Sequence, residues 1–79
     1  MKITMRDGRV FQGTALQIVT AMQDIAFGVD DFTVPEYIDW VVANARRFEE
    51  VELKVEGASD EEKAKSLVEE MVRVGLAAR

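Results

Sequence analysis

The sequence contains neither cysteine nor histidine, and these two absences remove most familiar catalytic and metal-binding sites. Without cysteine there is no disulfide, no thiolate metal ligand and no thiol nucleophile. Without histidine the chain lacks the commonest general base, transition-metal ligand and pH switch, and a Ser-His triad is excluded. We therefore expect a non-enzymatic protein with no metal site and no cofactor. The lack of cysteine also suits a reducing cytoplasm.

Long apolar runs and an excess of positive charge are also missing. No apolar run approaches the length of a membrane span, and the first 30 residues lack the apolar core of a signal peptide. The formal net charge of −5 argues against affinity for nucleic acid or anionic membranes. Positive charge occurs early, at Lys2, Arg6 and Arg9, whereas residues 28–50 carry six acidic and two basic residues. We expect a cytoplasmic protein without membrane contact.

The length of 79 residues predicts a single domain over residues 1–79, because a second core would not fit. A chain this short buries only about 60–65% of its unfolded surface, so a marginal monomer or a dimer is expected. The hydrophobic fraction of 48% and the charged fraction of 32% are those of a globular protein. So small a domain offers no deep cleft, and no small-molecule ligand is predicted.

Residues 33–49 predict an amphipathic helix that holds the only Trp and the only Tyr of the chain. Thr33 and Glu36 have the spacing of a capping box, and the single proline, Pro35, falls in the first turn, where it is tolerated. At about 100° per residue one face of this helix is apolar. That face consists of Val34, Tyr37, Ile38, Val41, Val42, Ala45 and Phe48.

Trp40 lies at the edge of this apolar face, beside Tyr37, Asn44 and Arg47. Aromatic residues with an arginine are typical of the energetic centres of protein interfaces. The same residues could instead pack against a neighbouring helix or strand. We take Tyr37, Trp40, Asn44 and Arg47 as the candidate partner surface.

Residues 2–12 predict a β-hairpin that turns at an Asp-Gly pair. A two-residue turn would place Val10 on the inner face with Ile3. A three-residue loop with a bulge at Gly8 would place Phe11 there instead. Burying Phe removes more apolar area from water than burying Val, so we favour the bulged turn.

Three further elements are predicted. A helix is expected over residues 14–27, with a capping box from Thr14 to Gln17 and a stop at Gly28. Another helix is expected over residues 59–74, with a Schellman stop at Gly75 that brings Leu76 against Met71. Residues 51–56 alternate between apolar and charged side chains and predict a strand with one exposed face.

These elements predict a small two-layer α+β domain with the order ββααβα. A three-stranded sheet with three helices packed on one face is the simplest arrangement. The last strand could lie beside either arm of the hairpin. Residues 76–79 are expected to form a frayed tail.

The helix expected at residues 14–27 carries almost no charge, since Asp24 is the only charged residue within it. Exposed helix surfaces normally carry Lys and Glu, so this helix is expected to be contacted on two sides. A homodimer would explain this, and so would coverage by the hairpin and the last helix of the same chain. The candidate self-association surface consists of Leu16, Thr20, Gln23 and Phe27.

An Asp-Gly hairpin running into Phe-Gln-Gly-Thr, followed by Glu-Tyr-Ile-Asp-Trp-Val, is similar to short uncharacterised bacterial proteins. The resemblance covers mainly residues 5–45. It implies a bacterial cytoplasmic setting, but it implies no activity and no site residue.

We therefore predict a small non-enzymatic protein-interaction or regulatory domain whose partner is another protein or a second copy of itself. The alternative is a weak nucleic-acid-binding accessory protein. In that case Lys2, Arg6 and Arg9 of the basic hairpin would contact the phosphate backbone, although three cations make a thin patch.

Overall fold

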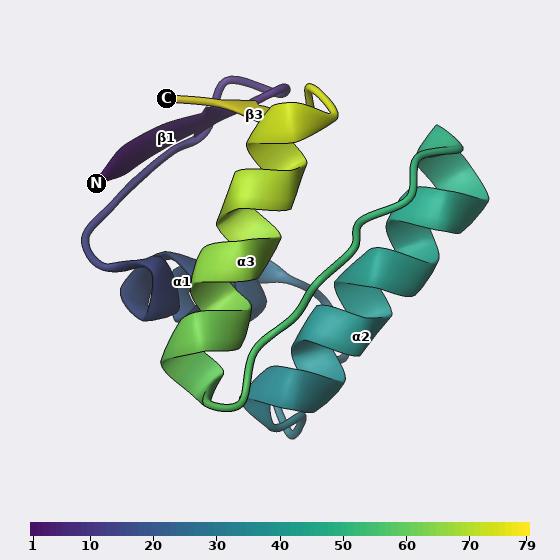
Figure 1. Ribbon diagram of the computed structural model, residues 1–79. Coiled ribbons are helices and arrows are strands. Elements are labelled where there is room, and N and C mark those ends of the chain that lie inside the picture. Colours follow the sequence, from purple (N-terminus) through teal and green to yellow (C-terminus); the bar gives the residue numbers. More distant parts are fainter.

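The computed structural model describes residues 1–79 and begins with the predicted β-hairpin (Figure 1). Strand β1 (Lys2–Met5) pairs antiparallel with β2 (Val10–Gln12). Ile3 lies opposite Phe11, which confirms the register with the bulged turn. Phe11 packs against the core from this position, whereas Val10 has 53% of its surface exposed.

Three α-helices follow: α1 (Ala15–Ile25), α2 (Val34–Asn44) and α3 (Asp60–Arg73). The predicted capping boxes at Thr14 and Thr33 are both present, so the exposed amides at the start of α1 and α2 are satisfied locally. None of the helices combines the length and the apolar sequence needed to cross a membrane.

Two of the predicted glycine stops have different outcomes. At the end of α3 the Leu76 amide donates to the Met71 carbonyl at 2.8 Å, and Gly75 has a φ of +85°, which confirms the expected Schellman motif. Helix α1 instead ends early, because Ala26 is already extended. Gly28, with a φ of +82°, therefore belongs to the turn that follows and not to the helix cap.

The helix predicted over residues 33–49 changes its winding before it ends. After α2 the chain continues in a π-helical turn, η1 (Ala45–Glu49), in which hydrogen bonds span five residues instead of four. This wider turn moves the following side chains out of the α-helical phase. Phe48, which the α-helical period places on the inner face, is consequently 69% exposed.

The third strand lies near the end of the chain and not at residues 51–56. Strand β3 (Ala77–Ala78) pairs antiparallel with the free edge of β1, so the order in the sheet is β2-β1-β3. The element order is ββαααβ in place of the predicted ββααβα. Part of the tail expected to fray at residues 76–79 therefore completes the sheet, with Ala77 buried.

Residues 51–56 are extended and alternate in burial as predicted, with Leu53 only 3% exposed, but they join no strand. They run between α2 and α3 in Figure 1, and side chains of α3 bond their backbone. The contacts join the Lys54 amide to Glu70 Oε1 (2.8 Å), the Glu56 amide to Ser66 Oγ (3.0 Å) and Arg73 Nη2 to the Glu52 carbonyl (3.0 Å).

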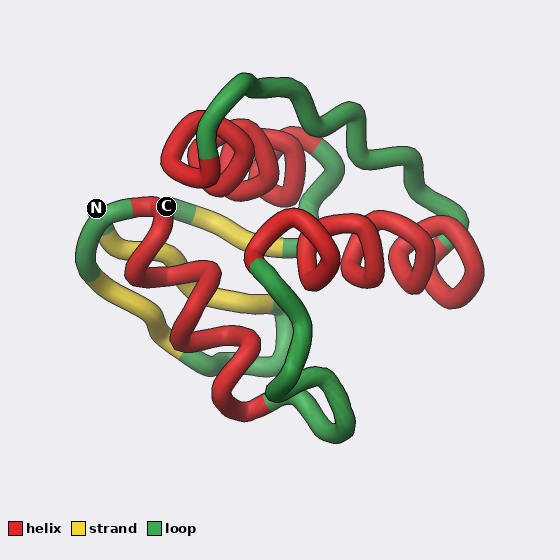
Figure 2. The backbone as a smooth tube through the Cα atoms, turned by 90° about the horizontal axis from the view of Figure 1, so that it is seen from below, coloured by secondary structure: helices red, strands yellow, loops and turns green.

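The helices do not all cover the sheet. Helix α1 packs on β2 and α3 packs on β3, whereas α2 packs on α1 and α3 and contacts no strand. Figure 2 shows α2 extending away from the strands. The chain is thus an α+β domain with a three-stranded antiparallel sheet and three helices, but the prediction that all three helices pack on one sheet face is wrong for α2.

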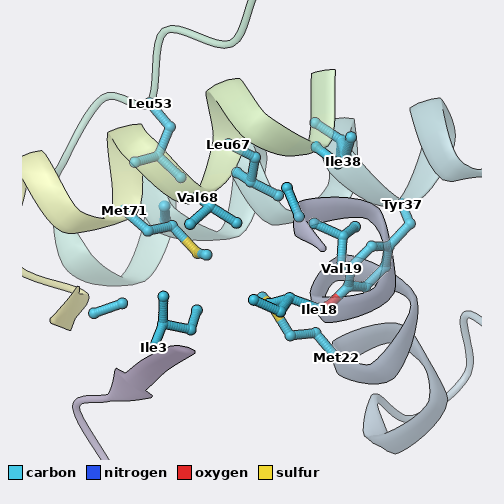
Figure 3. Packing of buried hydrophobic residues seen from close by; sticks show 14 of the residues in the cluster. Ile3, Ile18, Val19, Met22, Tyr37, Ile38, Leu53, Leu67, Val68 and Met71 are labelled. Carbon is cyan, nitrogen blue, oxygen red and sulfur yellow. The ribbon is translucent and has the colours of Figure 1, made fainter. Parts of the chain in front are cut away.

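One hydrophobic core joins the sheet to all three helices (Figure 3). Helix α3 lies at its centre, because its four inward side chains are each at most 1% exposed and it contacts α1, α2 and β3. The largest fully buried side chains are Ile3, Ile18, Val19, Ile38, Leu67, Val68 and Met71.

Candidate functional site

An open groove lies between α2 and the tip of the hairpin, where α2 and the sheet do not pack together. Its volume of about 590 Å³ is in the range of ligand-binding pockets, and nine of its thirteen lining residues are hydrophobic. We call it the aromatic groove. Its lining residues are Met5, Arg6 and Asp7 of the hairpin; Tyr37, Trp40, Val41, Asn44, Ala45, Phe48 and Glu49 of α2 and η1; and Met22, Met71 and Leu76.

Methionine and tyrosine side chains from different elements line the inner part of the aromatic groove. Met5, Met22 and Met71 come from β1, α1 and α3, and their flexible thioethers adapt to apolar groups of differing shape. Tyr37 is 3% exposed, and its ring reaches toward Ile18 and Met22 (Figure 3). Burial raises the pKa of Tyr37 to about 12, so its hydroxyl stays protonated at neutral pH.

Two aromatic rings on one wall of the aromatic groove remain open to solvent. Trp40 is 37% exposed and stacks on Tyr37, with ring centroids 5.8 Å apart and planes at 23°. Asn44 donates to the Trp40 carbonyl at 2.9 Å and so supports the end of α2. Beyond it Phe48 projects from η1, with the Arg47 guanidinium 5.3 Å from its ring centroid. The wall therefore offers two large, positioned apolar surfaces.

Charged side chains at the rim of the aromatic groove are paired with one another. Arg6 Nη1 lies 3.1 Å from Glu49 Oε2, and Arg6 also donates to the Gly75 carbonyl at 3.3 Å. Both partners of the ion pair are about half exposed, so the pair contributes at most about 1 kcal/mol to stability. Its effect is geometric, because it joins the hairpin to η1 across the groove.

The aromatic groove contains three of the four residues predicted as a partner surface: Tyr37, Trp40 and Asn44. The fourth, Arg47, lies outside it against the Phe48 ring. Phe48 was not predicted as a site residue, because only the π-helical turn brings it outward. The residues from the hairpin, α1 and α3 meet α2 only in the folded chain, and no local pattern indicates them.

The four residues predicted as a self-association surface do not form one surface. Gln23 is 8% exposed and donates to two carbonyls of the α1–α2 turn at 2.9 and 2.8 Å, so its assignment to an outer surface is wrong. The Thr20 hydroxyl bonds carbonyls of α1 itself, and Leu16 is half-buried at the opposite end of the helix. Phe27 alone is fully accessible, at 99%. Helix α1 carries little charge because β2, α2 and α3 of its own chain contact it.

The cations of the hairpin do not gather at its tip. Lys2 lies at the far end of β1, Arg6 is paired at the rim of the aromatic groove, and Arg9 lies 3.5 Å from Asp7. A nearby carboxylate partly neutralises each of these two arginines. The hairpin therefore offers nucleic acid only a thin and partly neutralised patch.

A polar hollow between residues 54–57 and α3 has a structural explanation. Its groups bond one another: the Arg73 guanidinium and then the Lys54 amide hydrogen-bond Glu70, and these contacts lower the pKa of Glu70 to about 2. No group of three Cys, His, Asp or Glu side chains in the chain could hold a metal ion. These contacts anchor residues 54–56 against α3.

No family model matches this chain, and no curated protein or solved structure is significantly similar to it. The geometry of the aromatic groove is consequently the basis on which a function is proposed.

Proposed function

We propose that this chain is a small non-enzymatic protein-interaction module that binds an apolar segment of a partner protein in the aromatic groove. The observation that carries the proposal is the groove itself: about 590 Å³ of open, mainly apolar space with Trp40 and Phe48 exposed along one wall. Exposed aromatic rings beside a preformed groove are typical of peptide recognition, in which anchor side chains enter apolar pockets.

The polar groups around the groove favour a protein segment over a small metabolite. Small-molecule sites place a few polar groups so that they converge on the ligand and orient it. Here Arg6 and Glu49 are paired with each other, and Asp7 is paired with Arg9. What remains is an adaptable methionine-lined surface, which suits the apolar side chains of an amphipathic segment.

The groove residues alone cannot supply a tight complex. Covering the exposed parts of Trp40 and Phe48, 37% and 69%, contributes about 3 kcal/mol. Association costs about 4–15 kcal/mol in lost translational and rotational freedom. The partner must therefore bring apolar anchors of its own, and we expect a reversible complex with a micromolar Kd. The proposed setting is the bacterial cytoplasm: the absence of cysteine suits a reducing compartment, and the bacterial setting rests on the resemblance of residues 5–45 alone.

Selection of random peptides on the folded protein, followed by titration of the selected peptides, tests this function. Trp40 is the only Trp, so its fluorescence reports binding in the groove directly. Phe48→Ala should weaken binding by about tenfold or more, because it removes one wall of the groove. Phe27→Ala is the matched control, since it removes an even more accessible phenyl ring (99% exposed against 69% for Phe48) outside the groove and should leave the Kd unchanged.

Two outcomes would count against this function. Selected peptides that bind Phe48→Ala as tightly as the wild type would place the contact elsewhere. Peptides that bind without changing the emission of Trp40 would lead to the same conclusion.

A further inference from the structure

A second, smaller hollow adjoins the aromatic groove, and Tyr37 lines both. Its volume is about 190 Å³, and its apolar walls include Phe11, Met22 and Ile25. An apolar protein cavity of about 150 Å³ holds one benzene molecule. The small hollow therefore has the size and the lining to receive one phenyl side chain.

The same region of the molecule carries an unburied phenyl ring. Phe27 is 99% exposed in the turn between α1 and α2, and this turn projects from the body of the molecule (Figure 2). The preceding residue, Ala26, lines the small hollow, and Ile25 beside it is 54% exposed. A projecting ring and a hollow of matching size thus lie next to each other on one surface.

We propose that two copies of this chain associate about a two-fold axis, with Phe27 of each copy inserted into the small hollow of the other. An isologous contact requires a surface that is complementary to itself. Because the ring and the hollow are adjacent, a two-fold axis between them satisfies both at once, and the assembly closes at a dimer.

Charge supports a second copy as the occupant. Asp30 and Asp31 follow Phe27 in the projecting turn and are exposed. Arg9 lines the small hollow together with Asp7; the Arg9 side chain is 61% exposed, and its Nε lies 3.5 Å from Asp7 Oδ2. A guanidinium has five N–H donors, so Arg9 can donate to a second carboxylate as well as to Asp7. The two-fold contact brings the acidic turn of one copy to Arg9 of the other.

Sedimentation equilibrium of the whole chain tests the dimer. The wild type should sediment as a dimer at tens of micromolar, and Phe27→Ala should raise the dissociation constant about thirtyfold or more. The ring is fully exposed, so this variant should keep the wild-type circular dichroism spectrum. A monomeric wild type, a dimer unaffected by Phe27→Ala, or assemblies larger than a dimer would each overturn the proposal.

Charge reversal locates the contact. Arg9→Glu and the double change Asp30→Lys with Asp31→Lys should each weaken the dimer, and combining them should restore it, because the opposite charges then face each other again. In a mixture of labelled and unlabelled chains, nuclear Overhauser effects should connect the Phe27 ring with the Met22 methyl group across copies. Failure of the combined variant to regain affinity, or effects only within one copy, would refute this geometry.

The proposed dimer and the proposed peptide-binding function can be tested independently of each other. Phe27→Ala should weaken the dimer and leave peptide binding unchanged, whereas Phe48→Ala, outside the small hollow, should weaken peptide binding and leave the dimer unchanged. Loss of both properties in either variant would show that the two hollows act as one site, which contradicts the dimer as proposed.

Discussion

Residues 51–56 and residues 77–78 are both extended, and they satisfy their backbone groups in different ways. Ala77 and Ala78 pair with the free edge of β1 and have no hydrophobic alternation that would predict a strand. Residues 51–56 alternate strictly, yet side chains of α3 bond their backbone. Ser66, Glu70 and Arg73 are spaced four and three residues apart, so they lie on one face of the helix and reach successive backbone groups.

Alternation of apolar and charged residues therefore indicates which side chains are buried, but it does not indicate which groups bond the backbone. Leu53 is buried and its neighbours Glu52 and Lys54 are exposed, as in a strand. Polar backbone groups must still find partners in a compact domain, and helix side chains can supply them. Because residues 51–56 do not pair with the free edge of β1, Ala77 and Ala78 pair with it instead.

Among the changes to residues 51–57, Leu53→Ala should lower the free energy of unfolding most. Leu53 is 3% exposed and is the one fully buried side chain of residues 51–56. Its truncation should lower the free energy of unfolding by about 2–5 kcal/mol through lost apolar burial and a residual cavity, measured by urea denaturation. Val51→Ala, at a half-buried position, should cost clearly less. Equal losses would show that the segment is not anchored through Leu53.

Gly57→Ala should have an intermediate effect, because Gly57 turns the segment into α3. Gly57 has a φ of +146°, and an added Cβ would lie 2.8 Å from the Lys63 backbone nitrogen. We expect a loss of about 2–3 kcal/mol in unfolding free energy. Gly8→Ala is the control: its φ is +95° but nothing lies within 4 Å, so strain alone should cost about 1 kcal/mol. A tolerated Gly57→Ala would mean that this turn is looser than the structure shows.

Protonation of Glu70 should have the smallest effect on the stability of the fold. Hydrogen bonds from Arg73 and the Lys54 amide lower the pKa of Glu70 from 4.5 to about 2 in the folded chain. The carboxylate therefore stabilises the fold above pH 4.5, and this stabilisation is lost as the pH falls toward 2. Glu70→Gln should flatten the dependence of the urea midpoint on pH across this window.

Hydrogen exchange of the backbone amides can distinguish the individual contacts that α3 makes with residues 51–56. Glu70→Ala should speed exchange of the Lys54 amide and leave the Glu56 amide protected, because Ser66 holds the latter. Ser66→Ala should do the opposite. If both variants expose both amides, the segment opens as one unit and the individual contacts do not hold it independently.

Local sequence signals predicted most of the elements but not how they meet. The capping boxes at Thr14 and Thr33, the bulged hairpin and the Schellman end of α3 each depend on a few neighbouring residues, and all were confirmed. The partner of residues 51–56 depends on α3, which comes later in the chain. The position of α2 likewise depends on competition between the sheet and the other helices for its apolar face.

The candidate site was predicted only where it lies on one helix. Trp40 was expected at the edge of α2 from its angular position, and the structure places it on the groove wall. The outward position of Phe48 follows from the π-helical turn, which has no signature in the local residue pattern. Gln23 was misassigned because a neutral side chain fits both an interface and an internal hydrogen bond, and only the turn that it holds decides between them.

The central position of β1 has a consequence for how the chain folds. Thr4 pairs with Val10 on one side and with Ala78 on the other, so one edge closes locally and the other only across almost the whole sequence. Loop-closure entropy makes the second pairing about 2 kcal/mol more costly than the first. During folding, β1 therefore keeps an open edge until β3 arrives, and an unpaired edge can recruit a strand from another chain. Aggregation of this protein should accordingly begin at β1, with the arrival of two alanines as the step that prevents it.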